Sequence, residues 1–143
     1  IAGRDPGDDV LALADELPGI DVLGFVDDLD ALLAESSAAV VPVWKGAGIK
    51  MKTLTLMGSG LPVASTTVGL EGIAAVDGEH ARIADDPVAL ATAVGDLVAN
   101  RERAEQLGRT GRELILTGHT WDGVIGQIEA VLGRVQRRPQ LAP

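Results

Sequence analysis

An unbroken apolar run, AAVVPV at 38–43, constrains the fold of this chain more than any other feature. Such a run is typical of a strand in a parallel sheet, because helices cover both faces of that strand. A second apolar segment, LPVAST at 61–66, follows after a stretch with helical spacing at 50–59. Parallel neighbours need a crossover connection between them, so this succession predicts a βαβ unit.

The same alternation continues on both sides of this unit. Weaker strand-like segments are found at 1–3, 20–25 and 80–84. Apolar residues at helical spacing predict further helices at 8–19, 27–37, 85–98, 101–116 and 120–135. This order predicts an α/β fold: a Rossmann-like doubly wound parallel sheet with a helical C-terminal end.

Polar residues mark where three of these helices begin. The expected N-caps are Asp27 or Asp28, then Asp86 with Pro87 in the first turn, and Thr120.

The chain has the length of one domain, and it contains no linker or internal repeat. We therefore predict one domain over 1–135 and a flexible tail over 136–143. The sequence opens with IAGRDPGDD, without Met, on what looks like the end of a strand. Domains seldom begin within a strand, so we expect a fragment of a longer polypeptide, truncated at its N-terminal side.

Charge and composition exclude several classes of partner. The chain has 21 acidic and 12 basic residues, a formal charge of −9, and it would repel nucleic acids and anionic lipid surfaces. It has no cysteine, which excludes disulfides and thiolate metal sites. No apolar run approaches the roughly 20 residues of a membrane span. We predict no nucleic-acid partner and no membrane span.

The segment WKGAGIKMK at 44–52 is the best candidate for a binding loop. It follows a predicted strand, and ligands of doubly wound sheets bind beyond the carboxyl ends of the strands. Gly46 and Gly48 lead into a helix whose first turn carries Lys50 and Lys52. Helix amides and ammonium groups together favour a phosphate. A solvated basic pair in a tight turn is the alternative, and spacing alone does not decide between them.

Other catalytic signatures are missing. The loop lacks the Gly-Lys-Ser/Thr of a Walker A sequence and the third glycine of the dinucleotide fingerprint. The two histidines, His80 and His119, lie far apart without partners at ligand spacing, so we interpret both as surface loop residues.

The order of segments resembles group 1 (family 4) glycosyltransferases, and in particular the C-terminal, nucleotide-sugar-binding domain of their two-domain GT-B fold. The resemblance covers residue 1 to about residue 132, and it is most specific over 46–72. There the family pattern has a glycine-rich loop, two basic positions, LEAMAxGxPVV and TxxGxEG. The matching residues are Lys50, Lys52, Leu54, Met57, Gly60, Pro62, Val63, Thr66, Gly69, Glu71 and Gly72.

The family's Glu-x7-Glu motif is altered in this chain. Its first glutamate falls on Ala47 and its second on Thr55. In family members the second carboxylate holds the ribose hydroxyls of the nucleotide, and the first contacts the donor sugar. Thr55 is the more serious departure, because a threonine hydroxyl is neutral, shorter and reaches at most one partner.

The resemblance also implies roles for individual residues. The backbone of Gly24, Phe25 and Val26 would face the nucleobase. Gly48, Ile49 and Lys50 would lie at the diphosphate, with Lys52 nearby or packed behind it. The turn from Thr66 through Thr67 to Gly69 would line the sugar end, and Glu71 belongs to the same set, as does Thr55 at the ribose.

From this resemblance we expect the donor-binding part of a retaining glycosyltransferase that takes a sugar from a nucleoside diphosphate of UDP or GDP type. It implies no metal and no other cofactor, a missing N-terminal acceptor domain as partner, and a cytoplasmic location, with the inner face of the membrane as an alternative for the parent protein. A non-catalytic nucleotide-binding or interaction domain that has lost the motif glutamates is the competing interpretation. A receiver-like regulator is disfavoured, because VVPVW offers no phosphoacceptor aspartate at its strand end.

Overall fold

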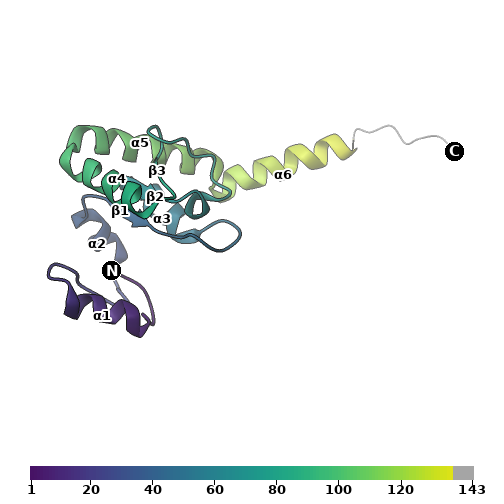
Figure 1. The fold of residues 1–143 in the computed structure, drawn as a ribbon. Helices are drawn as coiled ribbons and strands as arrows, with labels where there is room; N and C mark the ends of the chain where they lie inside the picture. The colour runs from purple at the N-terminus through teal and green to yellow at the C-terminus, as the bar shows by residue number, and fades with distance from the viewer. Residues whose placement is uncertain (137–143) are drawn as a thin grey trace. The chain divides into compact units, whose positions relative to one another are not determined.

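A computed structural model describes residues 1–136 of the chain, leaving aside the side chains at 122, 127, 135 and 136. Figure 1 shows the described elements as a ribbon. In chain order they are α1 (Asp8–Glu16), α2 (Leu29–Glu35), β1 (Ala39–Val41), α3 (Met51–Gly58), β2 (Val63–Ser65), the 3-10 helix η1 (Val68–Leu70), β3 (Arg82–Ile83), α4 (Pro87–Ala99), α5 (Arg101–Gly118) and α6 (Trp121–Gln136).

The chain separates into two compact units, Ile1–Glu35 and Ser36–Pro143. The first contains α1 and α2, and the second contains the sheet with the remaining helices. The single domain over 1–135 stays a prediction.

The two strands predicted in the first unit are reduced to one parallel bridge, between Ala2 and Gly24. Two hydrogen bonds make it: Gly3 N donates to Gly24 O at 2.8 Å, and Leu23 N donates to Ile1 O at 2.8 Å. Leu23 is exposed and α1 has no buried residue, so side-chain packing does not extend the pairing.

The start of α2 is capped by Asp28 rather than Asp27. The Asp28 Oδ1 atom accepts a hydrogen bond from Ala31 N at 2.9 Å. This is the geometry of an N-cap, and it settles which of the two predicted residues caps the helix.

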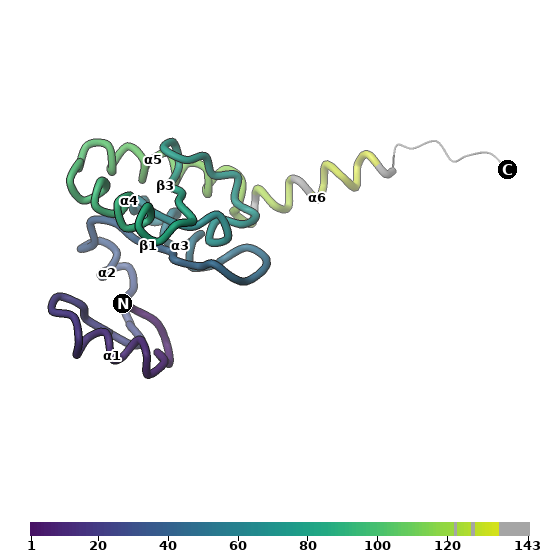
Figure 2. Tube along the Cα trace, viewed as in Figure 1, coloured from purple at the N-terminus to yellow at the C-terminus, as the bar shows by residue number. Residues whose placement is uncertain are grey.

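The second unit is built on a three-stranded sheet with the order β1-β2-β3. Both pairs are parallel, with Val40 opposite Ala64 and Ala64 opposite Arg82. The predicted parallel sheet is confirmed, although each strand is shorter than its apolar segment. Figure 2 follows the chain from β1 into a wide loop that returns to the start of α3.

Two apolar clusters cover opposite faces of β2, because neighbouring strand residues point to opposite sides. Val63 joins the cluster with Met57 of α3, whereas Ala64 joins the cluster with Leu90 and Leu97 of α4. The long helix α5 contributes to both, through Ile115 to the first and Leu107 to the second. Helices on both faces of a parallel sheet make the doubly wound arrangement that the sequence predicts.

One detail of β1 differs from the prediction. Val41 is buried, but Val40 is 48% exposed, so β1 is not covered on both faces. Val40 lies opposite Ala64, on the face where the α4 cluster packs. Helix α4 packs against β2 and β3, and β1 is the end strand of the sheet.

The C-terminal end is helical, as predicted. Asp86 Oδ1 accepts a hydrogen bond from Ala89 N at 2.9 Å at the start of α4, and Thr120 Oγ1 accepts one from Gly123 N at 3.2 Å before α6. Both predicted N-caps are confirmed. Gln136, the first residue of the predicted tail, ends α6, and 137–143 lie outside the described residues.

Several large apolar side chains of α6 remain exposed. They recur three or four residues apart, which places them along one side of the helix, and they are Trp121, Val124, Ile125, Ile128, Val131 and Leu132.

Across residues 1–136, every helix is either too short or too polar to cross a membrane.

Two glycines let α5 lie directly on the backbone of the sheet unit. A Cβ on Gly108 would lie 2.2 Å from Gly60 O, and one on Gly111 would lie 2.7 Å from His80 O. Real Cβ atoms do not approach carbonyl oxygens this closely, so any side chain here would push the helix away from the sheet.

We predict that Gly108→Ala lowers the free energy of unfolding by about 2–3 kcal/mol, because overpacking against backbone cannot be relieved by a rotamer change. The matched control is Gly95→Ala in α4, where a Cβ would meet nothing within 4 Å. That change should raise the unfolding free energy by about 0.5–1 kcal/mol through helix propensity. Urea unfolding monitored by circular dichroism measures both. Equal effects of the two substitutions would contradict the close approach of α5.

Candidate functional site

The carboxyl ends of the three parallel strands meet at one edge of the sheet. The segment after each strand is hydrogen-bonded to its neighbour there. The Thr66 hydroxyl donates to Val43 O beyond β1, and Ala84 N donates to Ser65 O at 3.0 Å. These contacts bring together the 42–50 loop, the turn after β2 and the start of α4.

Asp85 is the strongest link at this edge. Its Oδ1 accepts a hydrogen bond from Thr67 N at 2.8 Å, and its Oδ2 accepts one from the Thr67 hydroxyl at 2.8 Å. Its backbone carbonyl accepts a hydrogen bond from Trp44 Nε1 at 2.7 Å. Asp85, which follows β3, therefore holds both the segment after β1, through Trp44, and the segment after β2, through Thr67.

Sequence reasoning missed Asp85. The sequence did contain a signal: two aspartates, Asp85 and Asp86, precede α4, and an N-cap uses only one of them. With Asp86 capping the helix, Asp85 is left to bond elsewhere.

The turn after β2 is held from inside. Gly69 N donates to Thr66 Oγ1 at 3.1 Å, and Gly69 O accepts from the buried Thr53 hydroxyl of α3 at 2.8 Å. A Cβ on Gly69 would lie 2.2 Å from Ser65 Oγ, so only glycine fits. The polar groups of Thr66 and Gly69 thus maintain the shape of the turn, and Thr67 is the exposed residue next to them.

The glycine-bearing loop before α3 adopts backbone conformations that favour glycine. Gly46 has φ 135° and Gly48 has φ 76°, both in the region that other residues rarely adopt. Lys50 folds back over this loop: its Nζ donates to Gly48 O at 2.6 Å and lies 3.4 Å from Glu71 Oε2. Ile49 packs beside Gly72, where a Cβ would lie 2.5 Å from Ile49 Cγ1. The loop is therefore joined to the 71–72 segment at two neighbouring points.

The start of α3 has features that favour an anion. Lys50 is the N-cap residue and supplies no side-chain capping bond, and the first turn contains no acidic residue. Lys52 is exposed in that turn. The first amides of a helix carry a partial positive charge, which attracts negatively charged groups.

Thr55 lies on the outer side of α3. Thr55 is exposed, and its hydroxyl donates to Met51 O at 3.1 Å, one turn back along the helix. Thr53 and Met57, two positions away on either side, are buried against the sheet unit. A side chain at position 55 is accordingly free to extend without entering the core.

The predicted nucleobase segment lies in the first unit. Gly24 makes the bridge to Ala2 and has φ 63°. Phe25 is exposed, and the Arg4 guanidinium carbon lies 4.7 Å from the centroid of its ring. The role of Gly24, Phe25 and Val26 at a nucleobase stays a prediction.

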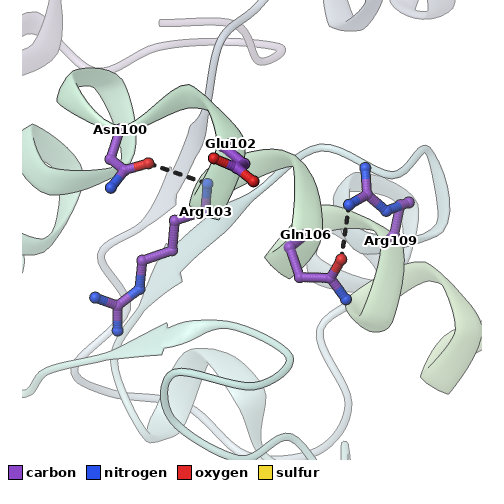
Figure 3. Close-up of a pocket in the computed structure, with 5 residues that line it drawn as sticks. All are labelled: Asn100, Glu102, Arg103, Gln106 and Arg109. Atoms are coloured by element: carbon purple, nitrogen blue, oxygen red, sulfur yellow. Dashed lines mark hydrogen bonds between the residues drawn. The ribbon is translucent and has the colours of Figure 1, made fainter.

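A hollow lies along the first turns of α5, lined by Asn100, Glu102, Arg103, Gln106 and Arg109 (Figure 3). Two of its groups are already used: Asn100 Oδ1 accepts from Arg103 N at 3.1 Å, and Arg109 Nη2 donates to Gln106 Oε1 at 2.6 Å. Helix α4 leaves the carboxyl edge of the sheet and ends just before Asn100, so this hollow belongs to the opposite edge. It does not contribute to the candidate site.

One ion pair stands beside that hollow. Arg101 Nε donates to Glu105 Oε1 at 2.7 Å, and this hydrogen bond lowers the pKa of Glu105 and raises that of Arg101. Both side chains are well exposed, so solvent screens the pair and it stabilises α5 little.

Neither histidine takes part in a metal cluster. His80 Nδ1 accepts a hydrogen bond from Val76 N at 3.2 Å in a loop, and His119 follows α5. Within residues 1–136, no three His, Asp or Glu side chains converge as metal ligands would.

The model of one protein family, described as glycosyl transferases group 1, matches residues 1–100. The chain belongs to the group 1 glycosyl transferases. No curated protein sequence matches the chain.

Solved structures of two proteins resemble this group 1 glycosyl transferase chain in fold. A sucrose-phosphate synthase from Thermosynechococcus elongatus matches with a TM-score of 0.76 at 22% identity, over 93% of this chain and 37% of that protein. The C-terminal domain of a glycosyl transferase group 1 family protein, LpcC, from Francisella tularensis matches with a TM-score of 0.60 at 19% identity, over 70% of this chain and 53% of that one. The chain thus spans between about a third and a half of these structures. The family and the half GT-B fold that the sequence predicts are confirmed.

The structure brings most of the predicted residues of this glycosyl transferase chain to one region. Gly48, Ile49, Lys50 and Glu71 are joined around the loop, and Thr66, Thr67 and Gly69 form the neighbouring turn. Lys52 and Thr55 lie on α3, which begins at that loop. Their roles as ligand contacts stay predictions.

We predict that Asp85→Ala lowers the free energy of unfolding by about 1–2 kcal/mol, since it removes two charge-assisted hydrogen bonds to Thr67. Asp96→Ala is the control, because Asp96 is a surface aspartate that faces Arg82 at 3.4 Å. An exposed pair of that kind contributes at most about 1 kcal/mol, so this change should be nearly neutral. Urea midpoints decide the comparison, and a neutral Asp85→Ala would show that Asp85 does not hold the turn.

Proposed function

We propose that this chain is the donor-binding part of a retaining glycosyltransferase that moves a sugar from a nucleoside diphosphate to an acceptor. The observation that carries the proposal is the loop at 46–50. It lies at the carboxyl edge of a parallel sheet, opens an uncapped helix and holds a lysine between a glycine carbonyl and a carboxylate. Edges of this kind are where doubly wound folds bind their ligands.

The diphosphate has a natural place at this loop. Its charge is attracted by the start of α3, by the Lys50 ammonium and by the exposed Lys52. The turn of Thr66, Thr67 and Gly69 then lies at the sugar end, beside Glu71. UDP and GDP are the nucleoside diphosphates to test first.

Thr55 decides how well the ribose is held. Thr55 is exposed one turn into α3, on the same side as Met51, and the family's carboxylate belongs at this position. The threonine hydroxyl bonds the Met51 carbonyl and offers no negative charge. We infer weak donor binding by this chain, in roughly the millimolar range, which corresponds to about −4 kcal/mol.

The acceptor and its activating groups belong to a further domain. A cleft between two domains excludes water and fixes the acceptor. Each of these effects lowers the activation free energy of sugar transfer by about several kcal/mol. The competing function is a non-catalytic nucleotide-binding domain, favoured by the replacement of both motif glutamates, by Ala47 and Thr55. Sugar transfer by the polypeptide that includes the acceptor domain separates the two.

We predict that Lys50→Ala weakens binding of UDP or GDP by about 1–2 kcal/mol, because a hydrogen bond to a charged group is lost. Titration calorimetry on the chain measures the effect. Lys45→Ala is the control, since it removes an exposed ammonium from the same loop. Equal weakening by both variants would indicate general charge attraction instead of a phosphate contact at Lys50.

We predict that Thr55→Glu tightens the binding of the same nucleotide, by about 1.5 kcal/mol, because a carboxylate accepts ribose hydroxyls. The unfolding free energy should hardly change, since Thr55 is exposed. Thr92→Glu in α4 is the control: Thr92 is also exposed and its hydroxyl also bonds one turn back, to Val88 O at 2.9 Å. A stable Thr55→Glu variant without tighter binding would show that position 55 does not face the ribose.

A further inference from the structure

The ammonium of Lys50 is already occupied in the chain without ligand. Its side chain is only 14% exposed, and two acceptors surround Nζ: the Gly48 carbonyl at 2.6 Å and the Glu71 carboxylate at 3.4 Å. A phosphate that binds Lys50 must therefore share the ammonium with these groups or displace one of them.

The two acceptors differ in how easily they give way. The bond to Gly48 O is short and comes from the backbone of the loop that carries Lys50. The contact to Glu71 is longer than the roughly 2.7–2.9 Å of a strong charge-assisted bond. The Glu71 side chain is 49% exposed, so it can turn into water at little cost. Gly48 accordingly positions Lys50, and Glu71 is the exchangeable partner.

The neighbourhood of Glu71 is fixed by packing. Ile49 lies against Gly72, whose missing Cβ leaves the space that the Ile49 side chain fills. The Gly72 backbone, with φ 79°, is also one that glycine favours. The residues next to Lys50 and Glu71 are thus in contact, which keeps the carboxylate beside the ammonium.

We propose that Glu71 is an intramolecular competitor of the phosphate: its carboxylate occupies Lys50 in the free chain, and a bound diphosphate takes its place. This inference rests on the proposed function, because it assumes that Lys50 meets the diphosphate. It assigns to Glu71 a specificity role, since a ligand must carry enough negative charge to replace a carboxylate. Neutral or weakly charged sugars do not release Lys50.

The test is the affinity of the chain for UDP, GDP and inorganic pyrophosphate, by titration calorimetry, in the unchanged chain and in Glu71→Gln. Removing the competing carboxylate should tighten binding about three- to tenfold, the size expected for one screened charge at close range. Glu102→Gln is the matched control, because Glu102 is an exposed glutamate at the opposite edge and the substitution changes the net charge equally. Its affinity should equal that of the unchanged chain.

Three results would overturn the inference. Glu71→Gln that weakens binding as Lys50→Ala does would make Glu71 a positioning residue for Lys50. Glu71→Gln that matches Glu102→Gln would leave Glu71 without influence. Tighter binding of a neutral sugar by the same factor would remove the dependence on charge.

The proposed function fails on different measurements. An unchanged affinity of Lys50→Ala for UDP and GDP contradicts the proposed function. If no variant binds any of these ligands, both the proposed function and the competition by Glu71 are wrong. Binding by Glu71→Gln where the unchanged chain shows none supports the competition directly. A thermal melt of each variant verifies that the fold is retained, as expected for a half-exposed side chain.

Discussion

Parallel pairing around β2 is the constraint on which the rest of the sheet unit depends. Val63, Ala64 and Ser65 are all buried, and β2 has a parallel neighbour on each side. Because parallel strands end at the same edge, the three following segments must meet there. Ser65, Thr66 and Asp85 turn this proximity into hydrogen bonds between segments. The loop before α3 is positioned as a consequence, since it leaves β1 at that edge.

Much of this fold could be predicted from apolar patterns alone. The apolar runs at 38–43 and 61–66 contain β1 and β2. Asp86 caps α4 and Thr120 caps α6, as predicted. The prediction of full strands at 1–3 and 20–25 was wrong, because apolar residues form a buried strand only where other side chains cover them. Leu23 and Phe25 are exposed, and a single bridge is all that forms. Val40, in the end strand β1, is likewise 48% exposed.

The candidate site was predictable where backbone conformation depends on residue type. Gly46 and Gly48 have the positive φ values that glycine allows, and they lie in the predicted phosphate loop. Contacts between segments far apart in the sequence were not predictable. Asp85 reaches Thr67 and Trp44, and Glu71 reaches Lys50, through geometry that only the folded sheet creates. Thr53 and Thr55 illustrate the same limit: their letters are identical, yet one is buried on Gly69 and the other faces water.

Helix α5 has a consequence for how the sheet unit opens. It supplies Ile115 to one apolar cluster and Ala104 with Leu107 to the other, and its glycines rest on backbone near Gly60 and His80. Hydrogen exchange shows that proteins open in contiguous cooperative units that often coincide with supersecondary motifs. Here one helix, α5, belongs to both apolar clusters, so neither cluster can open while α5 stays packed on the sheet unit. We therefore expect the amides of β2 to exchange through one opening reaction that also releases α5.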